Sequence, residues 1–245
     1  MNNIVKKILL VTSVLMVFGT VFADAAYKTI TAKELRVIQE SKKRVYIFDA
    51  LTPIHYRVAH IPRAANIPVG KILVGGKLNP RLPKNKDAHV VFYCMDFECL
   101  LSGINANDAI KEGFTNVSVM REGIVGWKAA GYPVQKSGLV LPKITPKTIT
   151  TSELKSNLDN VYLVGLLSGV SAAGIIKGTV YVPIAELMMK YKQIPKNKNV
   201  VLYSIKGKTD KIAVKFLVAK GYDENKIKYL KGGVTQWIKD GYSVQ

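Results

Sequence analysis

The pattern of apolar and polar positions divides most of the chain into short apolar runs and longer amphipathic segments. Apart from Ser118, residues 45–48, 90–93 and 117–120 are apolar, aromatic or β-branched, as is typical of short buried strands. A helix is predicted over about 100–112, because Gly113 follows the end of this amphipathic segment. Strands that alternate with helices predict an α/β fold, with a mostly parallel sheet flanked by helices on both faces.

The same pattern occurs a second time, 110 to 119 residues further along the chain. Residues 29–35 return as 148–154, and Gly126 and Trp127 correspond to Gln236 and Trp237. The second copy places its strands at residues 161–164, 200–203 and 227–230 and its helix at about 211–220. Two copies of this size predict two domains, because a solenoid needs shorter and more numerous repeats.

The boundary between the copies lies in residues 135–147, where Ser137, Gly138, Pro142 and Pro146 interrupt the pattern. We therefore expect one domain over residues 26–136, a linker over 137–147 and a second domain over 148–245.

The N-terminus has the pattern of a secretory signal peptide. Lys6 and Lys7 precede the apolar residues 8–22, and small residues follow. We expect residues 1–25 to be removed, which predicts export to the bacterial periplasm or cell envelope. A membrane anchor is the alternative, but residues 8–22 are shorter than the ~20 residues that span a bilayer, so no stable span is expected after cleavage.

The chain is strongly basic, with 36 Lys and Arg residues against 17 Asp and Glu residues. Such a charge often indicates nucleic-acid binding. Export argues against nucleic acid, and the lysines are spread along the surface-like segments 190–198 and 206–231 rather than gathered in one stripe. An anionic lipid surface or an acidic protein of the periplasm stays open as a partner.

Cys94 directly follows the second apolar run and is a candidate nucleophile. A turn between a strand and a helix can aim backbone N–H groups at the sulfur, and the positive end of the helix stabilises an anion there. A thiolate held in this way has a lowered pKa. The alternative is a buried, inert core cysteine.

Metal chemistry has little support in the sequence. His55, His60 and His89 have no metal-ligand spacing with one another or with Cys94 and Cys99. No metal or cofactor is expected.

Several motifs resemble the rhodanese family when they are taken in order. They are a strand ending in Asp49, the stretch AHIPRAANIP at residues 59–68, the cysteine after an apolar strand, and EG…GW…AGYPV at residues 122–134. The second copy carries related motifs at residues 174–183 and 230–242. The resemblance implies a tandem rhodanese-like sulfurtransferase. In it, Cys94 accepts a sulfane sulfur from a donor as a persulfide and passes it to a thiol acceptor.

The six-residue loop from Cys94 departs from the family, whose loop is usually rich in glycine and cations. It continues with Met95, Asp96, Phe97, Glu98 and Cys99, so it carries two carboxylates. Both oppose a thiolate and repel thiosulfate unless their side chains point to solvent. We therefore expect polysulfide or a protein persulfide to be a better donor than thiosulfate. Leu51 also replaces the arginine that usually follows the first aspartate.

Two other residues of the first copy are predicted to support the loop. Asp49 is expected to bind loop amides rather than to act as an acid or base. His60 is expected to orient the HIP stretch through a hydrogen bond, and catalysis by His60 is the less favoured alternative.

The corresponding loop of the second copy reverses these features. Its members are Ser204, Ile205, Lys206, Gly207, Lys208 and Thr209. It has the glycine and cations of an anion cradle but lacks the sulfur, and the sequence indicates no base for the serine. The second domain is therefore predicted to be structural, or to bind an anion or a partner.

Cys99 leaves two alternatives open. It could pair with Cys94 as a resolving thiol, which would make the chain a thiol-redox protein of the envelope or a redox-gated transferase. It could instead begin the helix unpaired beneath the loop, which the strain of so short a ring favours. A further alternative is a binding module without efficient chemistry.

Overall fold

The computed structural model describes residues 27–41, 43–167 and 174–245. The predicted signal peptide lies outside the described residues, so its cleavage stays a prediction. Within the described part of the chain, no helix combines the length and the apolar character needed to cross a membrane.

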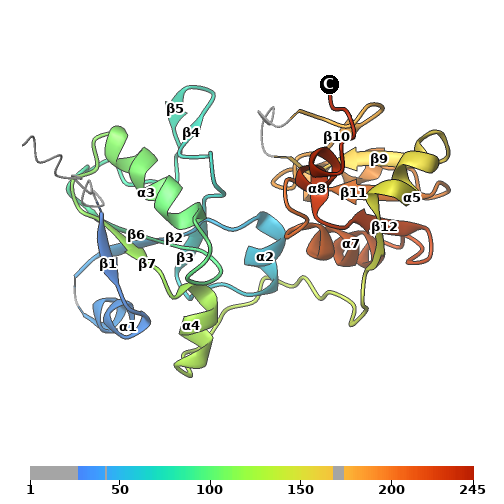
Figure 1. The fold of residues 1–245 in the computed structure, drawn as a ribbon. Helices are drawn as coiled ribbons and strands as arrows, with labels where there is room; N and C mark the ends of the chain where they lie inside the picture. Colours follow the sequence, from blue (N-terminus) through green and yellow to red (C-terminus); the bar gives the residue numbers. More distant parts are fainter. Residues whose placement is uncertain (1–26, 42, 168–173) are drawn as a thin grey trace, which may run out of the picture.

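The first half of the chain forms a parallel five-stranded sheet in the order β1-β7-β6-β2-β3. Its strands are β1 (Lys28–Ile30), β2 (Val45–Asp49), β3 (Ala64–Asn66), β6 (His89–Tyr93) and β7 (Val117–Met120). Figure 1 shows α3 (Leu101–Lys111) on one face and α1 (Ala32–Glu40) with α4 (Gly123–Ala129) on the other.

The second half repeats this arrangement with the strand order β10-β9-β11-β12-β8, again all parallel. Its strands are β8 (Lys147–Ile149), β9 (Tyr162–Gly165), β10 (Val180–Tyr181), β11 (Val200–Tyr203) and β12 (Ile227–Leu230). The helices and 3₁₀ turns are α5 (Thr151–Ser156), η1 (Leu158–Asn160), α6 (Leu187–Lys190), η2 (Tyr191–Gln193), α7 (Asp210–Ala219) and α8 (Gly233–Lys239).

The predicted α/β fold with two tandem domains is confirmed, and the three strands predicted in each copy lie within one residue of their observed bounds. The sequence reasoning missed the short edge strands and the first helix of each copy. Those helices do carry a signal, because Thr31 with Glu34 and Thr150 with Glu153 form capping boxes. It also missed α2 (Pro53–Val58) and the antiparallel pair β4 (Leu73–Val74) and β5 (Lys77–Leu78).

Each sheet is buried on both faces, which explains why its central strands are apolar at nearly every position. Phe48, Val90 and Phe92 pack toward α3, whereas Val91 and Tyr93 pack with Trp127 toward α1 and α4. Trp127 donates its indole N–H to the carbonyl of Pro133, and Trp237 does the same to Ser243. Both tryptophans are thus buried core residues with their polar atom satisfied.

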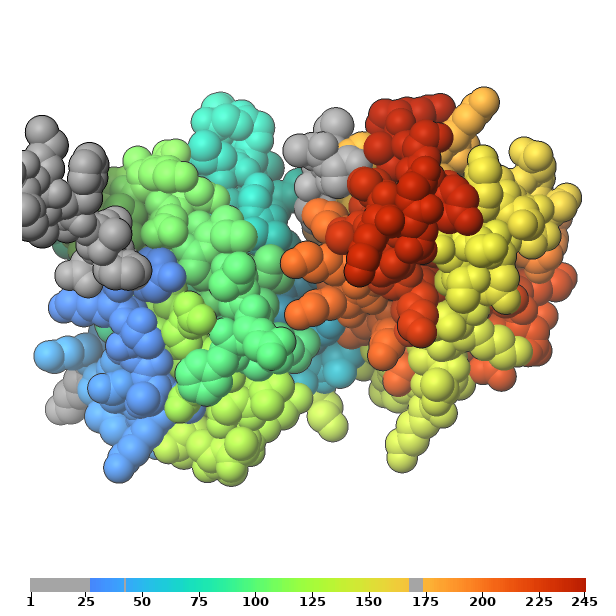
Figure 2. Space-filling model, viewed as in Figure 1, coloured from blue at the N-terminus to red at the C-terminus, as the bar shows by residue number. Residues whose placement is uncertain are grey.

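The two domains are in contact through α2. Ile54 on this helix is fully buried, and it belongs to the core cluster of the second domain together with Val214 and Leu217 of α7. Figure 1 shows α2 between the first sheet and α7, and Figure 2 shows the two lobes touching on the viewed face. Lys71 and Glu186 add an ion pair between the domains at 3.9 Å. Burial of Ile54 therefore couples the stability of the two domains.

Candidate active site around Cys94

The loop 94–99 leaves the carboxyl end of β6 and leads into α3, next to the ends of β2 and β7. Its backbone is attached to the first turn of α4, because the N–H groups of Ile124 and Val125 donate to the carbonyls of Cys94 and Met95. Gly123 has φ +61°, and a Cβ at this position would clash with the Met95 backbone. The close approach therefore requires a glycine, and it fixes the first two loop residues against a helix N-terminus.

Cys94 and Cys99 form a disulfide, with their Cα atoms 6.2 Å apart. The expectation that ring strain keeps Cys99 unpaired is wrong for this structure. The physical reason is the curl of the loop, in which Cys99 N–H donates to the Asp96 carbonyl. This turn brings the two Cα atoms within the distance range that a disulfide requires.

The two cysteine residues differ in their exposure to solvent. Cys94 is 1% exposed, whereas Cys99 is only partly buried. Cys94 Sγ lies 3.0 Å from the carbonyl oxygen of Cys99 and 3.3 Å from Ser102 Oγ. In the disulfide the Ser102 hydroxyl is the donor to this sulfur, and after reduction the same hydroxyl can stabilise a Cys94 thiolate.

Two of the loop amides are directed at Asp96 rather than at the sulfur. Glu98 N–H donates to Asp96 Oδ1, and Cys99 N–H donates to the Asp96 carbonyl. The Asp96 side chain thus closes a turn within the loop instead of leaving the Glu98 amide to a bound anion.

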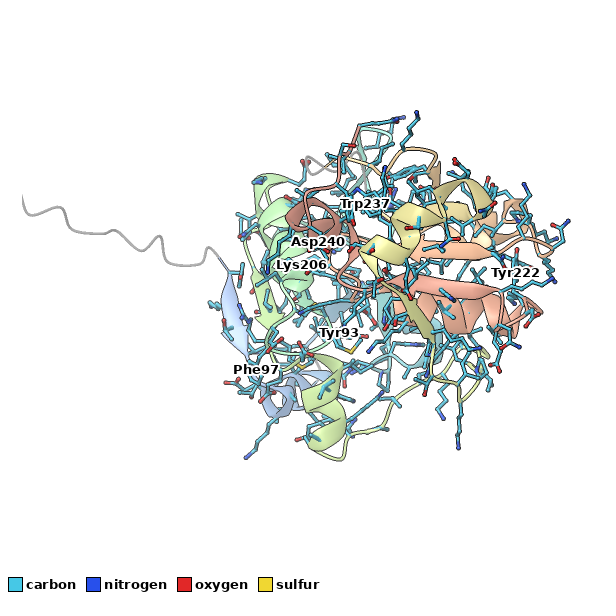
Figure 3. The ribbon with its side chains drawn as sticks, turned by 45° about the vertical axis from the view of Figure 1, so that its right-hand side comes forward. Tyr93, Phe97, Lys206, Tyr222, Trp237 and Asp240 are labelled. Carbon is cyan, nitrogen blue, oxygen red and sulfur yellow. A yellow bond between two sulfur atoms is a disulfide. The ribbon has the colours of Figure 1, made fainter. Side chains whose placement is uncertain are left out.

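A cation that the sequence reasoning missed reaches the loop from the end of β7. Arg121 Nη2 donates to the carbonyl of Phe97 at 2.9 Å. Figure 3 shows Phe97 at the outer edge of the first lobe, with Tyr93 further inside. Arg121 therefore partly offsets the two loop carboxylates. Its position directly after a central strand is the signal that could have identified it.

Asp49 is fully buried at the end of β2 and has two donors. Its Oδ1 accepts from Leu51 N–H at 2.8 Å, and its Oδ2 accepts from the Tyr93 hydroxyl at 2.9 Å. Burial raises the pKa of Asp49 to about 7, against the lowering effect of these hydrogen bonds. The Asp49 carboxylate therefore accepts from the Tyr93 hydroxyl. The side chain at position 51, which is Leu51, is buried and offers it no charge.

His60 lies in the stretch before β3 and is buried. Its Nδ1 lies 2.8 Å from the carbonyl of Tyr56, and its ring stacks on the Tyr56 ring with centroids 3.8 Å apart. Its backbone exchanges two hydrogen bonds with Gln135. These contacts hold the HIP stretch against the end of the first domain.

The loop 204–209 of the second domain has the same backbone attachment but a different interior. Val234 and Thr235 at the start of α8 donate to the carbonyls of Ser204 and Ile205. Gly207 N–H donates to Ser204 Oγ at 3.1 Å. Thr209 directly precedes α7.

Asp210, the first residue of α7, is fully buried beneath this loop and was missed by the sequence reasoning. Its Oδ2 accepts from Ser204 N–H at 3.1 Å. Burial raises the pKa of Asp210 to about 6. The sequence indicated no base for Ser204, whereas the structure places the Asp210 carboxylate against the Ser204 amide. Because the loop interior already holds a carboxylate, an anion cradle at this place is disfavoured.

The two loops meet across the domain contact. Lys208 Nζ lies 3.8 Å from Glu98 Oε2, and both side chains are largely exposed. Lys206 is labelled in Figure 3 on the part of the second lobe that borders the first. The second loop therefore directs one of its two lysines at the acidic loop of the first domain.

The sequence profile of the rhodanese-like domain family matches this chain in two segments, residues 31–130 and 153–240. The chain therefore belongs to the rhodanese-like family, in a tandem form whose two matched segments correspond to the two sheets.

Particular relatives are more distant. Over 117 residues the chain is 32% identical to the probable adenylyltransferase/sulfurtransferase MoeZ of Mycobacterium tuberculosis, a match that covers 44% of this chain and 28% of the relative. The chain thus spans less than a third of that protein.

Among solved structures, a rhodanese-related protein from Thermoplasma volcanium is 26% identical, with a TM-score of 0.38, 40% of this chain covered and 97% of that one. The thiosulfate sulfurtransferase from Pseudomonas aeruginosa is 20% identical, with a TM-score of 0.42, 89% of this chain covered and 43% of that one.

Proposed function

We propose that this chain is an exported rhodanese-like sulfurtransferase that carries sulfane sulfur as a persulfide on Cys94. The observation that supports this most is the position of Cys94 at the carboxyl end of β6, with its sulfur 3.3 Å from Ser102 Oγ inside a rhodanese-like domain. Sites in parallel α/β sheets form at this end of the strands.

The proposed cycle begins with a free Cys94. The Cys94 thiolate attacks the outer sulfur of a sulfane donor, the donor leaves as its thiolate or sulfite, and Cys94 becomes a persulfide. An acceptor thiolate then attacks the outer sulfur, and Cys94 is released as a thiolate. Because Cys94 is bonded to Cys99 in this structure, reduction must precede the first turnover.

The loop charges bear on the choice of donor. Asp96 and Glu98 lie within five residues of Cys94, and Lys208 and Arg121 only partly offset them. Thiosulfate carries two charges on one small group, whereas a polysulfide separates its two charges along the chain and a protein persulfide carries one. The loop carboxylates therefore repel thiosulfate more strongly at the reacting sulfur. We therefore propose polysulfide or a protein persulfide as the preferred donor.

Mass spectrometry of the reduced chain tests this function. After incubation with thiosulfate, polysulfide or glutathione persulfide, a peptide containing Cys94 should gain about 32 Da, the mass of one sulfur atom. If none of the three donors adds this mass at Cys94, the sulfurtransferase proposal fails. If thiosulfate adds it fastest, or if Asp96→Gly fails to speed the reaction with thiosulfate, the donor preference fails.

The disulfide favours a second candidate, a thiol-redox protein that uses Cys94 and Cys99 as a reversible pair. Thiol counting on protein purified without reductant tests it. The expected result is no free thiol in the monomer and two after mild reduction. Two free thiols that persist after exposure to an oxidant of periplasmic strength would overturn it.

Export is proposed from residues 1–25 alone. N-terminal sequencing of protein recovered from the cell envelope should begin at Asp24 or Ala26. A chain that retains Met1 in a membrane fraction would favour an uncleaved anchor instead.

A further inference from the structure

We infer that the Cys94–Cys99 disulfide is attacked at Cys99, from a hollow beside α3 that fits a thiol-bearing segment of an acidic dithiol protein. This inference rests on the proposed function only in taking Cys94 as the functional thiol. It adds which sulfur reacts with the reductant, over which surface, and with what kind of partner.

Access to the two sulfurs determines the direction of attack. A thiolate must approach one sulfur of a disulfide while the other leaves. Cys94 is 1% exposed and lies under the loop, whereas Cys99 is partly exposed. Cys99 is therefore the sulfur that an external thiolate can reach, and Cys94 is the leaving group.

The Cys99 carbonyl oxygen, 3.0 Å from Cys94 Sγ, opposes a thiolate on this sulfur, whereas two other features favour it. Ser102 is buried, and its Oγ lies 3.3 Å from Cys94 Sγ, where the hydroxyl can donate to the charge that develops on this sulfur. Cys94 also precedes α3, an 11-residue helix whose N-terminus carries positive partial charge. A better stabilised leaving thiolate departs faster.

A hollow of about 190 Å³ lies beside Cys99 rather than beside Cys94. It is lined by Tyr27, Cys99, Leu100, Gly103, Ile104, Asn107 and Arg121. Leu100 is 64% exposed and Ile104 is 44% exposed, and Phe97 at 62% stands on the same loop. An apolar side chain next to the attacking cysteine can be buried here. Arg121 also lines the hollow, and its positive charge attracts the incoming thiolate.

The net charge of this chain and the two electrons needed to reduce its disulfide identify the class of partner. The chain carries 36 basic and 17 acidic residues, so an acidic protein is attracted at long range. Reduction of the disulfide needs two electrons and two protons, which a dithiol supplies.

In the first step the partner's thiolate bonds to Cys99 Sγ, and Cys94 leaves as a thiolate. In the second step the partner's other thiol, as its thiolate, attacks its own bonded sulfur, and Cys99 leaves as a thiolate that takes up a proton. The partner ends as a disulfide, and Cys94 is free to accept sulfur.

Trapping with thiol peptides tests the site of attack. The oxidised full chain is mixed with a capped Asp-Leu-Cys-Leu peptide, a capped Asp-Ser-Cys-Ser peptide or glutathione. The mixture is then quenched with acid, alkylated and mapped by mass spectrometry. We expect the mixed disulfide on Cys99 and the alkyl group on Cys94. A mixed disulfide on Cys94 overturns the inference.

The peptide pair and two surface variants test the hollow. The leucine-flanked peptide should react about fivefold faster than the serine-flanked peptide, as expected for burial of part of an apolar side chain. Ile104→Ser should remove most of this advantage without changing the rate with glutathione. Val37→Ser, at a similarly exposed apolar position on α1, should leave the advantage unchanged. Equal peptide rates, or equal effects of the two variants, overturn the docking surface.

The outcomes separate this inference from the proposed function. A reduced chain that gains sulfur on Cys94, while its oxidised form yields no Cys99 adduct with any thiol, retains the sulfurtransferase and loses this inference. A chain that forms the Cys99 adduct but never gains sulfur on Cys94 retains this inference and loses the sulfurtransferase.

Discussion

The loops 94–99 and 204–209 have the same backbone frame and opposite chemistry. Each follows the central strand of a parallel sheet. In each, two loop carbonyls accept hydrogen bonds from N–H groups in the first turn of a short helix that begins at a glycine with positive φ, Gly123 or Gly233. The first loop holds a disulfide and two carboxylates, whereas the second holds a serine and two lysines. A repeated frame therefore does not imply a repeated reaction.

The charge difference is local to the loops. Residues 26–136 contain 17 basic and 9 acidic residues, and residues 148–245 contain 15 and 7, so the two domains have the same net charge. The two domains also bury a carboxylate at different, non-equivalent positions. Asp49 lies at the end of β2 in the first domain, where the second has Gly165, and Asp210 lies under the second loop, where the first has the exposed Leu100. Each domain thus buries one carboxylate near its loop. In the second domain that carboxylate lies directly under the loop, whereas in the first domain the Cys94 sulfur lies there.

The largest expected difference between the loops is in sulfur transfer. Cys94→Ser should abolish persulfide formation, because a serine hydroxyl cannot carry sulfane sulfur. Ser204→Ala should keep the rate of sulfur transfer within about twofold of that of the parent chain, as expected for a loop that takes no part in the reaction. The measurement is the rate of sulfur transfer to a thiol acceptor after reduction. A comparable loss in both variants would mean that the second loop takes part in the reaction.

Burial raises the pKa of both Asp49 and Asp210, so stability should fall as the pH rises, and Asp49, with the larger shift, should contribute the larger part. The pKa of Asp49 is about 7 in the folded chain against the usual 3.8, so between these values the folded state binds more protons than the unfolded state. Its contribution to stability is therefore full below about pH 4 and is lost as the pH rises through 7. Asp49→Asn should flatten this decline by on the order of a few kcal/mol.

Urea unfolding between pH 4 and 8, followed through Trp127 fluorescence in a Trp237→Phe background, measures this dependence. The exposed Asp159→Asn is the matched control and should keep the slope of the parent chain. An Asp49→Asn variant whose stability still falls as steeply as the control would refute the assignment.

The buried carboxylate under the second loop should suppress a thiolate placed there. In a chain whose own cysteines are replaced by serine, Ser204→Cys should react slowly with iodoacetamide at pH 7. Adding Asp210→Asn should raise that rate about tenfold, because the like charge beside the sulfur is removed while an oxygen remains to accept from the residue 204 amide. No change in rate would mean that Asp210 does not act on the sulfur.

The smallest expected effect is the ion pair that joins the loops. A double-mutant cycle of Glu98→Gln and Lys208→Gln should give a coupling of about 0.3 kcal/mol in the free energy of unfolding that vanishes in 1 M salt, as is typical of exposed pairs. The pair between Glu186, which directly precedes α6, and Lys190 provides a reference of shorter distance, 2.7 Å. A coupling that persists in high salt would indicate a buried contact between the loops.

The sequence by itself determined the two-domain α/β organisation, the central strands and the place of Cys94. Strands such as β6 and β11 are buried on both faces, so nearly every residue in them is apolar. Such a run can be recognised in the sequence without knowing which strands pair with it. Chain order then places Cys94 and Ser204 at the carboxyl ends of strands, because parallel strands joined by helices all point the same way.

Only the tertiary structure decided the chemistry within and between the loops. The Cys94–Cys99 pairing depends on how tightly six residues curl, and the contacts of Ser102 and Arg121 depend on the directions of α3 and β7. Composition and spacing carry no information on these directions. The burial of Asp210 beneath Ser204 and the approach of Lys208 to Glu98 depend in the same way on side-chain direction and on the docking of two separate domains, which the buried Ile54 fixes in space.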